Sequence, residues 1–375
     1  GPRSRVAALL DALHAELELR AAAAPLGAPS LGSVYLGGGT PSLMSAAQVE
    51  TLLTAIDDRL GIASNAEVTL EANPGADELG DLAGFRGAGV NRLSVGAQSM
   101  QDEELRRLGR RHRAADVRVA VEEAREAGFG SVSLDLLADI PGQSLDSWAA
   151  TLRAALDLAP DHLSAYTLTL DDPDAEGLTG PDGDHLPLSR GARAWRERSL
   201  PEQSEERAAE MELLTDELTA AVGLRRYEIA NLARPGQESR HNLLYWRRRP
   251  YLAIGPGAHA SDGHRRRTWN AARLDAYLGA LARRELPPGG SEVVDEATAL
   301  AEAAILGLRL SEGIEGTLAA APVVVPGLEW ARERDLVEVV AGRTRLTQQG
   351  RLLANEVFQR LLPESATGAQ SGGGR

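Results

Sequence analysis

Apolar residues in the first half of the chain recur with two alternating periods. Short runs rich in β-branched and aromatic residues predict buried strands at 33–36, 66–71, 91–96, 131–137 and 162–170. Apolar residues spaced three and four apart predict helices at 3–24, 46–60, 77–88, 101–109, 114–127 and 145–158. Five strands that alternate with helices, at spacings of roughly 30 residues, indicate βαβ units and a parallel sheet.

The predicted fold class is therefore α/β. Right-handed crossovers would curl these units into all or part of an α/β barrel. An open, doubly wound sheet is the alternative. Periodicity does not distinguish the two, because both are built from the same repeating unit.

The pattern is less regular in the second half of the chain. A stretch rich in Asp, Gly and Pro at 172–200 predicts a long surface excursion, and apolar spacing predicts a helix at 205–222. The region 223–270 mixes polarities, is rich in aromatic residues and arginine, and is expected to be irregular. Another helix is predicted at 295–310.

The C-terminal region combines a predicted helix at 327–335, a hairpin turning at Ala341-Gly342 and a closing helix at 349–362. This order predicts a small winged-helix-like α+β domain. We accordingly divide the chain into a barrel, a connecting region, a C-terminal domain and a tail expected to be disordered. These four parts are expected at 1–200, 201–290, 291–364 and 365–375.

Charge and composition narrow the range of partners. The 375 residues include 40 basic side chains, all of them arginine, and 54 acidic ones, giving a net charge of −14. Nucleic-acid binding is not expected, because phosphate backbones require a basic face. The absence of an apolar run of about 18 residues and of a signal-peptide pattern predicts a cytoplasmic protein. Cysteine is absent, so these residues offer no disulfide and no thiolate metal ligand.

A glycine turn follows the first predicted strand. Gly37, Gly38 and Gly39 allow the backbone to turn and to approach a ligand, and Pro41 prevents the strand from continuing. A plausible helix cap, Ser45, comes next. A strand, a glycine loop and a helix in this order predict a ligand-binding edge at the carboxyl end of a parallel strand, although a tight turn that binds nothing fits the same pattern.

Polar residues also follow or interrupt three later strands. Glu71 closes one strand, Gln98 follows another, and Asp135 lies between leucines inside a third; Arg110 follows a helical segment. Each has an ordinary structural explanation by itself, although an unpaired carboxylate such as Asp135 is costly to bury. In an α/β barrel all four would converge on one mouth, where they suit the amine, carboxylate and ribose hydroxyls of a nucleoside-like amino acid.

Several segments resemble the radical-SAM enzymes related to oxygen-independent coproporphyrinogen III oxidase. They are Gly37-Gly38-Gly39-Thr40-Pro41-Ser42, Glu71-Ala72-Asn73-Pro74, Arg92-Leu93-Ser94-Val95-Gly96-Ala97-Gln98-Ser99 and Asp135 with Pro141-Gly142-Gln143. Further segments are similar to the haem chaperone branch of that family. These are Tyr227-Glu228-Ile229-Ala230-Asn231, His241-Asn242-Leu243-Leu244-Tyr245-Trp246 and Gly255-Pro256-Gly257-Ala258-His259.

The resemblance implies a partial (β/α)6 TIM-like barrel that binds S-adenosylmethionine (SAM), with a smaller C-terminal domain. The residues implied in the SAM pocket are Gly38, Gly39, Thr40, Glu71, Gln98, Arg110 and Asp135. It also implies a haem-binding segment, made of His241, Asn242, Tyr245 and Trp246. His241 would be an axial ligand of the haem iron, although a histidine that only fixes a loop fits as well.

The chain departs from the family pattern at one essential point. The family's first strand and its Cys-x3-Cys-x2-Cys loop, which hold a 4Fe–4S cluster, would precede Arg3 and are missing. A truncated longer protein is the expected explanation, and a natural cysteine-free form is the alternative.

We expect a haem chaperone that passes haem to acceptor proteins, with membrane contact only through such an acceptor. The alternatives are an oxygen-independent coproporphyrinogen III oxidase, which decarboxylates porphyrinogen propionates, and a non-catalytic SAM-binding or scaffold protein.

Overall fold

The computed structural model describes residues 2–22 and 30–363. The predicted disordered tail at 365–375 lies outside the described residues. Residues 23–29, between the first helix and the first strand, also lie outside them. No helix in the described parts of the chain is both long and apolar enough to cross a membrane.

Five parallel strands form the centre of the structure. Each strand pairs with the strand before it in the chain, in the order β1-β2-β3-β4-β5. They are β1 (Leu31–Leu36), β2 (Ile62–Ala72), β3 (Arg92–Gln98), β4 (Ser131–Ala138) and β5 (His162–Thr167). Beyond β5 the sheet continues with two short antiparallel strands, β7 (Asn231–Ala233) and β6 (Arg225–Arg226).

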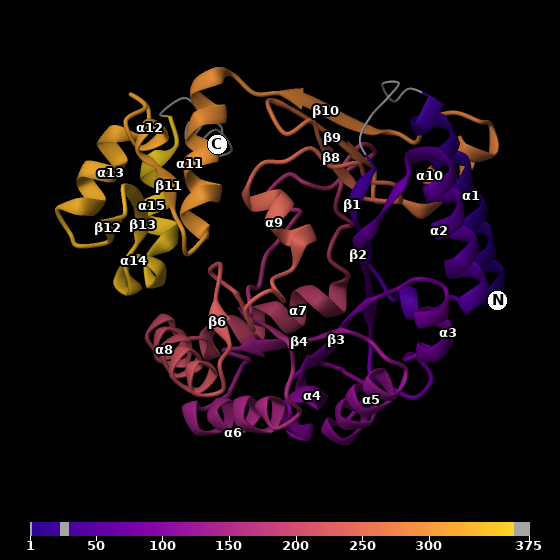
Figure 1. Ribbon diagram of the computed structural model, residues 1–375, viewed down its shortest axis with the longest axis horizontal. Helices are drawn as coiled ribbons and strands as arrows, with labels where there is room; N and C mark the ends of the chain where they lie inside the picture. The colour runs from indigo at the N-terminus through magenta and orange to yellow at the C-terminus, as the bar shows by residue number, and fades with distance from the viewer. Residues whose placement is uncertain (1, 23–29, 364–375) are drawn as a thin grey trace.

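The strand order decides between the two predicted architectures. A doubly wound sheet reverses its strand order at a switch point, and β1 to β5 contain no reversal. The helices lie around the outside of the arc of strands (Figure 1). They are α2 (Ala46–Leu60), α3 (Leu82–Gly87), α4 (Asp102–Arg107), α5 (Ala114–Glu126), α6 (Leu145–Leu156) and α8 (Glu205–Ala221). The partial barrel is therefore confirmed, and the open sheet is wrong.

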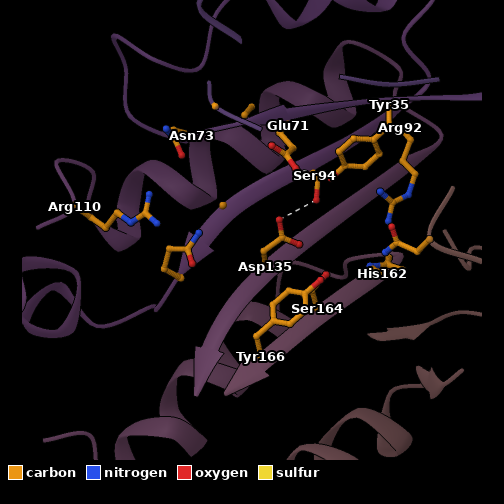
Figure 2. A pocket seen from close by; sticks show the side chains of 15 residues that line it. Tyr35, Glu71, Asn73, Arg92, Ser94, Arg110, Asp135, His162, Ser164 and Tyr166 are labelled. Atoms are coloured by element: carbon orange, nitrogen blue, oxygen red, sulfur yellow. Dashed lines mark hydrogen bonds between the residues drawn. The ribbon is translucent and has the colours of Figure 1, made fainter. Parts of the chain in front are cut away.

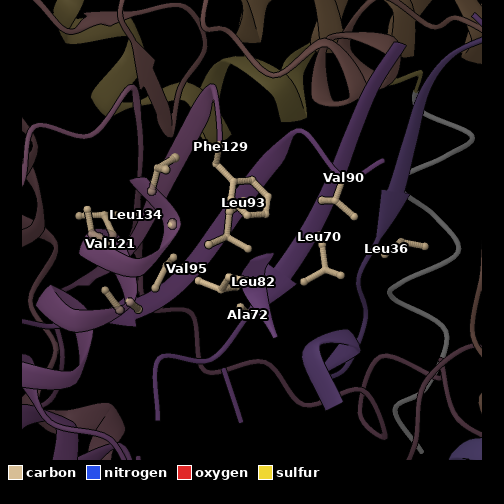
Figure 3. Packing of buried hydrophobic residues seen from close by; sticks show 14 of the residues in the cluster. Leu36, Leu70, Ala72, Leu82, Val90, Leu93, Val95, Val121, Phe129 and Leu134 are labelled. Carbon is tan, nitrogen blue, oxygen red and sulfur yellow. The ribbon is translucent and has the colours of Figure 1, made fainter. Parts of the chain in front are cut away.

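Successive side chains along each strand point alternately to the outer helices and to the inside of the barrel. In β3, Leu93 and Val95 are fully buried in the apolar cluster between the strands and the outer helices (Figure 3). The alternating residues Arg92, Ser94 and Gln98 line a cavity on the inner side of the arc. The same strands thus hold the barrel together on one face and present polar groups on the other.

A short helix occupies the inside of the arc. This helix, α9 (Arg240–Trp246), is the segment that carries the haem-type motif. The Ser239 side chain caps it by accepting a hydrogen bond from Asn242 N. Glu67 on β2 accepts bonds from the backbone N–H groups of Arg240 and His241, at 3.0 and 2.9 Å. A carboxylate at a helix N-terminus is favourable, so β2 fixes the position of α9.

A second sheet and a helix pair lie beside β1 and α2, at one edge of the arc (Figure 1). Strands β8 (His259–Ser261), β9 (Arg266–Asn270) and β10 (Gly289–Val293) form this antiparallel sheet. Helix α10 (Leu274–Ala282) packs on α1 (Pro2–Ala22) through Tyr277 and Ala12, both buried.

The C-terminal region has its own apolar core, which includes the fully buried Val324 and Val357. Its sheet order is β11-β13-β12. The Ala341-Gly342 hairpin is confirmed, with φ of 50° and 78° at these residues. The elements are α11 (Glu296–Arg309), β11 (Ile314–Glu315), α12 (Gly316–Ala319), α13 (Val325–Arg332), β12 (Val337–Val340), β13 (Arg343–Leu346), α14 (Gln348–Leu352) and α15 (Ala354–Leu361). The predicted boundaries at 200, 290 and 364 stay predictions.

Two predicted segments of irregular chain contain regular structure. The excursion at 172–200 includes α7 (Arg190–Ser199), which the Ser189 side chain caps, and a 3-10 turn follows it at Leu200–Glu202. The region 223–270 contains α9 and four short strands. Strands of two to five residues are too short to show a period, and their pairing depends on partners far away in the chain.

Two predicted helices are shorter than their apolar spacing indicates. The helix expected at 77–88 begins at Leu82, because Asp81 caps it after Gly80 turns with φ of 77°. The closing helix at 349–362 is two helices, which meet at Leu353.

Candidate functional site

A cavity of about 350 Å³ opens on the inner face of the barrel (Figure 2). All five parallel strands contribute to its lining, and one residue comes from α9. The lining residues are Tyr35, Gly39, Glu71, Ala72, Asn73, Arg92, Ser94, Gly96, Gln98, Arg110, Asp135, His162, Ser164, Tyr166 and Asn242. We call the end near the carboxyl ends of the strands the rim, and the end near their amino ends the floor.

The glycine turn forms part of the rim. Gly38, with φ of 78°, donates its N–H to Glu71 Oε2 at 3.1 Å, and the Tyr35 hydroxyl donates to Glu71 Oε1 at 2.7 Å. A Cβ at Gly37 would lie within 2.8 Å of both Tyr35 and Glu71, so only glycine fits there. At Gly39, which lines the cavity, a Cβ would have no heavy atom within 4 Å. The turn therefore leaves bare backbone open to a ligand.

Backbone strain places Gln98 at the rim. The ladder between β3 and β4 shifts register between Val95 and Gln98, and Gln98 adopts φ of 64°. Such a conformation is uncommon for a residue other than glycine, and it turns this side chain toward the cavity. Asn73 completes this edge by donating to Thr40 Oγ1 at 3.3 Å.

The SAM-type residues predicted from the sequence are gathered at one place. Gly39, Glu71, Gln98, Arg110 and Asp135 line the cavity. The two remaining residues, Gly38 and Thr40, adjoin it through their hydrogen bonds to Glu71 and Asn73. Convergence of this kind is what the barrel prediction requires.

Two carboxylates lie between two guanidinium groups along the cavity. Burial raises the pKa of Glu71, although its bond from Tyr35 opposes this. Burial also raises the pKa of Asp135, against the bond from Ser94 Oγ at 2.9 Å and the charge of Arg92. In Figure 2, Arg110 and Arg92 lie at opposite ends, with the carboxylates between them. The cavity thus suits a ligand that carries both cationic and anionic groups.

Sequence reasoning missed six strand side chains that line the cavity: Tyr35, Arg92, Ser94, His162, Ser164 and Tyr166. A signal for them was present. Each lies two residues from another inward-facing position on its strand, so the polar residues recur with a period of two inside runs that are otherwise apolar.

His241 lies against β1 with both ring nitrogens hydrogen-bonded. Nδ1 pairs with Ser33 Oγ at 2.9 Å and Nε2 with the Tyr245 hydroxyl at 2.8 Å. The imidazole stacks on Tyr35 with ring centroids 5.0 Å apart. Burial lowers the pKa of His241; the Glu67 carboxylate opposes the shift and Arg92 adds to it. The ring is therefore neutral at pH 7.

The other residues of the haem-type motif point in different directions. Asn242 lines the cavity, whereas Tyr245 packs on Tyr251 with ring centroids 4.7 Å apart, and burial raises the pKa of Tyr245 to about 12. Trp246 faces α11, where the Arg309 guanidinium lies 4.3 Å from its ring centroid. The motif therefore joins the barrel interior to the C-terminal region.

Within the described residues, no group of three or more His, Asp or Glu side chains is arranged to hold a metal ion. The 375 residues include no cysteine, so the residues present do not fit an iron–sulfur cluster.

Comparison with known proteins places this geometry in a family. The profile of the Radical SAM superfamily matches residues 13–155. The protein named heme chaperone HemW from Bacillus subtilis is 34% identical, over 93% of this chain and 90% of its own. The HemW proteins of Mycobacterium tuberculosis and Escherichia coli are 36% and 33% identical, over 94% and 88% of this chain and 86% and 84% of their own. The chain belongs to the HemW family of radical-SAM proteins.

The HemW similarity extends well beyond the radical-SAM match. An alignment over 88–94% of the chain necessarily includes α9 in its middle, whereas the superfamily profile ends before β5. The structure is also similar to that of coproporphyrinogen III oxidase (HemN) from E. coli. Its TM-score is 0.77 at 23% identity, over 96% of this chain and 84% of that one. This likeness establishes the fold.

Proposed function

We propose that this protein is a haem chaperone, which binds haem and transfers it to acceptor proteins. The observation that carries the proposal is the position of the His-Asn-x-x-Tyr-Trp helix. α9 lies inside the barrel, its Asn242 lines the same cavity as the SAM-type residues, and its sequence lies within the span shared with HemW relatives. One helix thus connects the segment associated with haem to the family's ligand pocket.

His241 is the proposed ligand of the haem iron. Iron requires an unprotonated nitrogen, and the lowered pKa of His241 supplies one at neutral pH. Nε2 becomes available when the Tyr245 hydroxyl moves away, while Ser33 keeps its bond to Nδ1 and holds the ring in place. A second hydrogen bond of this kind commonly fixes the tautomer and orientation of metal-bound histidines.

SAM is the proposed ligand of the rim. Its ammonium and sulfonium groups suit Glu71 and Asp135, its carboxylate suits a guanidinium, and its methionine part fits against the open backbone of Gly39. When bound beside a reducing cluster, SAM supplies a radical. The 375 residues contain no thiolate for such a cluster, and no radical step is assigned to them.

The remaining predictions concern the cellular setting. The proposed partners are haem and haem-accepting proteins, with no nucleic acid and with membrane contact only through an acceptor. The proposed location is the cytoplasm. Porphyrinogen decarboxylation is not favoured, because the similarity to HemN establishes only the fold.

Haem titration tests the proposal. Ferric haem is added to the purified chain while the Soret band is followed, and the haem-loaded chain is then mixed with an apo haem protein. The wild type is expected to bind haem. Haem is then expected to pass to the acceptor faster from the wild type than from a serum-albumin complex. His241→Ala is expected to weaken binding about 10- to 100-fold, as loss of a metal ligand or its support commonly does.

His185→Ala is the matched control, because the His185 side chain is exposed and lies more than 50 residues before α9 in the chain. It is expected to bind like the wild type. Equal affinities for all three proteins would remove His241 from the haem site, and a wild type that binds no haem would refute the proposed function.

A further inference from the structure

Arg92 is a buried arginine at the floor of the cavity. Its residue is only 4% exposed, and its Nε has no hydrogen-bond partner among the described residues. Within the same residues no carboxylate oxygen lies within 4.0 Å of its guanidinium nitrogens. A buried cation is normally paired, because removal of an ion from water is costly. The floor therefore holds a positive charge without a close counter-ion.

The two residues beside Arg92 in the sheet also have unused polar atoms. Arg92 is paired in register with Thr69 on β2 and Ser131 on β4, and the hydroxyls of both are buried without a hydrogen-bond partner. Residues in register on parallel strands point to the same face of a sheet. Three orphan polar groups thus lie in one row on the inner face, where buried polar groups are ordinarily satisfied.

The charge of Arg92 acts on the groups around the floor. It lowers the pKa of Asp135, His162 and His241, in each case as a smaller effect beside that of burial. Asp135 itself is turned toward Ser94, which donates to its Oδ2 at 2.9 Å (Figure 2). The Asp135 carboxylate, which shares the cavity with Arg92, is thus hydrogen-bonded to another partner, and Arg92 lines the cavity without an ion pair among the described residues.

We propose that Arg92 binds a carboxylate of the ligand that enters the barrel, with Thr69 and Ser131 completing the floor of that subsite. A planar guanidinium fork matches a carboxylate in two-point geometry. At about 350 Å³ the cavity is at the small end of ligand sites, so the floor receives a ligand's arm and not a whole macrocycle.

Two ligands could supply this carboxylate: SAM through its amino-acid group and haem through a propionate. The haem source rests on the proposed function and deepens it, because α9 and Arg92 border one cavity. The SAM source does not depend on haem binding. In both cases a ligand carboxylate would bind the Arg92 guanidinium.

The test compares each ligand with a form that lacks the carboxylate. The probes are SAM against decarboxylated SAM, and ferric haem against its dimethyl ester, each titrated into the full chain. For the ligand that reaches Arg92, Arg92→Gln is expected to weaken binding about 10- to 100-fold. Binding of the form without a carboxylate is expected to be unchanged. Arg92→Lys, which keeps the charge without the fork, is expected to lie between.

Arg118→Gln is the matched control, since Arg118 is exposed on the outer helix α5. Equal weakening of acid and ester forms by Arg92→Gln, or no weakening of any probe, would overturn the subsite. If Arg92→Gln does not fold, the wild type alone decides: equal affinity for acid and ester forms of both ligands also overturns it. A wild type that binds SAM but not haem refutes the proposed function while the SAM pair still tests Arg92, and binding of neither refutes both.

Discussion

Two histidines of this protein have hydrogen-bond partners of the same residue types but differ in how deeply they and their partners are buried. His162, at the start of β5, pairs through Nδ1 with Ser133 at 2.8 Å and through Nε2 with the Tyr227 hydroxyl at 2.9 Å. His241 pairs in the same way with Ser33 and Tyr245. A serine on one nitrogen and a tyrosine on the other holds each ring. The difference lies in what holds the tyrosine.

The Tyr227 hydroxyl is fixed from both sides. It accepts Ser239 N–H at 3.3 Å, which leaves its own proton for His162 Nε2, and both residues are almost fully buried. Tyr245 lies one turn after His241 on the same seven-residue helix, and both are only partly buried. The first arrangement is locked into the barrel, whereas the proposed haem site requires the second to open and release a nitrogen. A buried histidine therefore becomes a candidate ligand through the freedom of its partner.

The largest expected difference between the two sites is in stability. His162→Ala is expected to lower the free energy of unfolding by about 2–4 kcal/mol, because it leaves a cavity and removes the ring to which the buried Ser133 and Tyr227 hydroxyls are hydrogen-bonded. His241→Ala, at a partly buried position, is expected to cost about 1 kcal/mol or less. Urea denaturation followed by circular dichroism measures both. Equal losses would show that the two sites are equally structural.

The tyrosines give the next largest contrast. Tyr227→Phe is expected to destabilise the protein by about 1–2 kcal/mol, since it orphans both His162 Nε2 and Ser239 N. Tyr245→Phe removes the bond that competes for His241 Nε2, so haem affinity is expected to rise about 5-fold with little change in stability.

Soret titration and urea denaturation of the same two variants give the readouts. Weaker haem binding by Tyr245→Phe would contradict the release of Nε2 and would indicate that this hydroxyl supports the bound state instead.

The smallest effect is a dependence of stability on pH. The folded-state pKa of His162 lies well below the unfolded value of about 6.5, first because of burial and then because of Arg92. The stability that the neutral His162 contributes is fully present above pH 6.5. It is lost as the pH falls below that value, because the imidazole of the unfolded chain binds a proton more tightly than that of the folded chain. The limiting slope is about 1.4 kcal/mol per pH unit for one group.

Denaturation between pH 7.5 and 5.5 measures this slope. His162→Gln is expected to flatten the dependence of stability on pH more than His241→Gln does, because the pKa of His241 is less strongly lowered than that of His162. The raised pKa values of Glu71 and Asp135 change stability with pH in the opposite direction. Their contribution is the same in the variants and in the wild type, so it cancels in that comparison. Parallel curves for the wild type and His162→Gln would contradict the neutral, locked state of His162.

Local sequence determined the caps and turns that depend only on residues a few positions apart in the chain. The Ser45 cap forms, and its own N–H donates the reciprocal bond to Gln48 Oε1. The Ala341-Gly342 turn forms as predicted, and Gly37 is required where no Cβ fits. The strands β2 and β3, which end at Ala72 and Gln98, were also predictable, because their apolar runs and the polar residues near their ends adjoin in the chain. Convergence of the SAM-type residues followed once the barrel was assumed.

Tertiary structure alone decided what each polar residue faces. A period of two shows that Arg92 and His162 share a face with Ser94 and Ser164, but it does not show whether that face meets solvent, apolar side chains or a cavity. The place of α9 was equally hidden, because Glu67 caps it from more than 170 residues away. Pairings over such distances depend on closure of the whole barrel, and for that reason the floor of the cavity could not be read from its own residues.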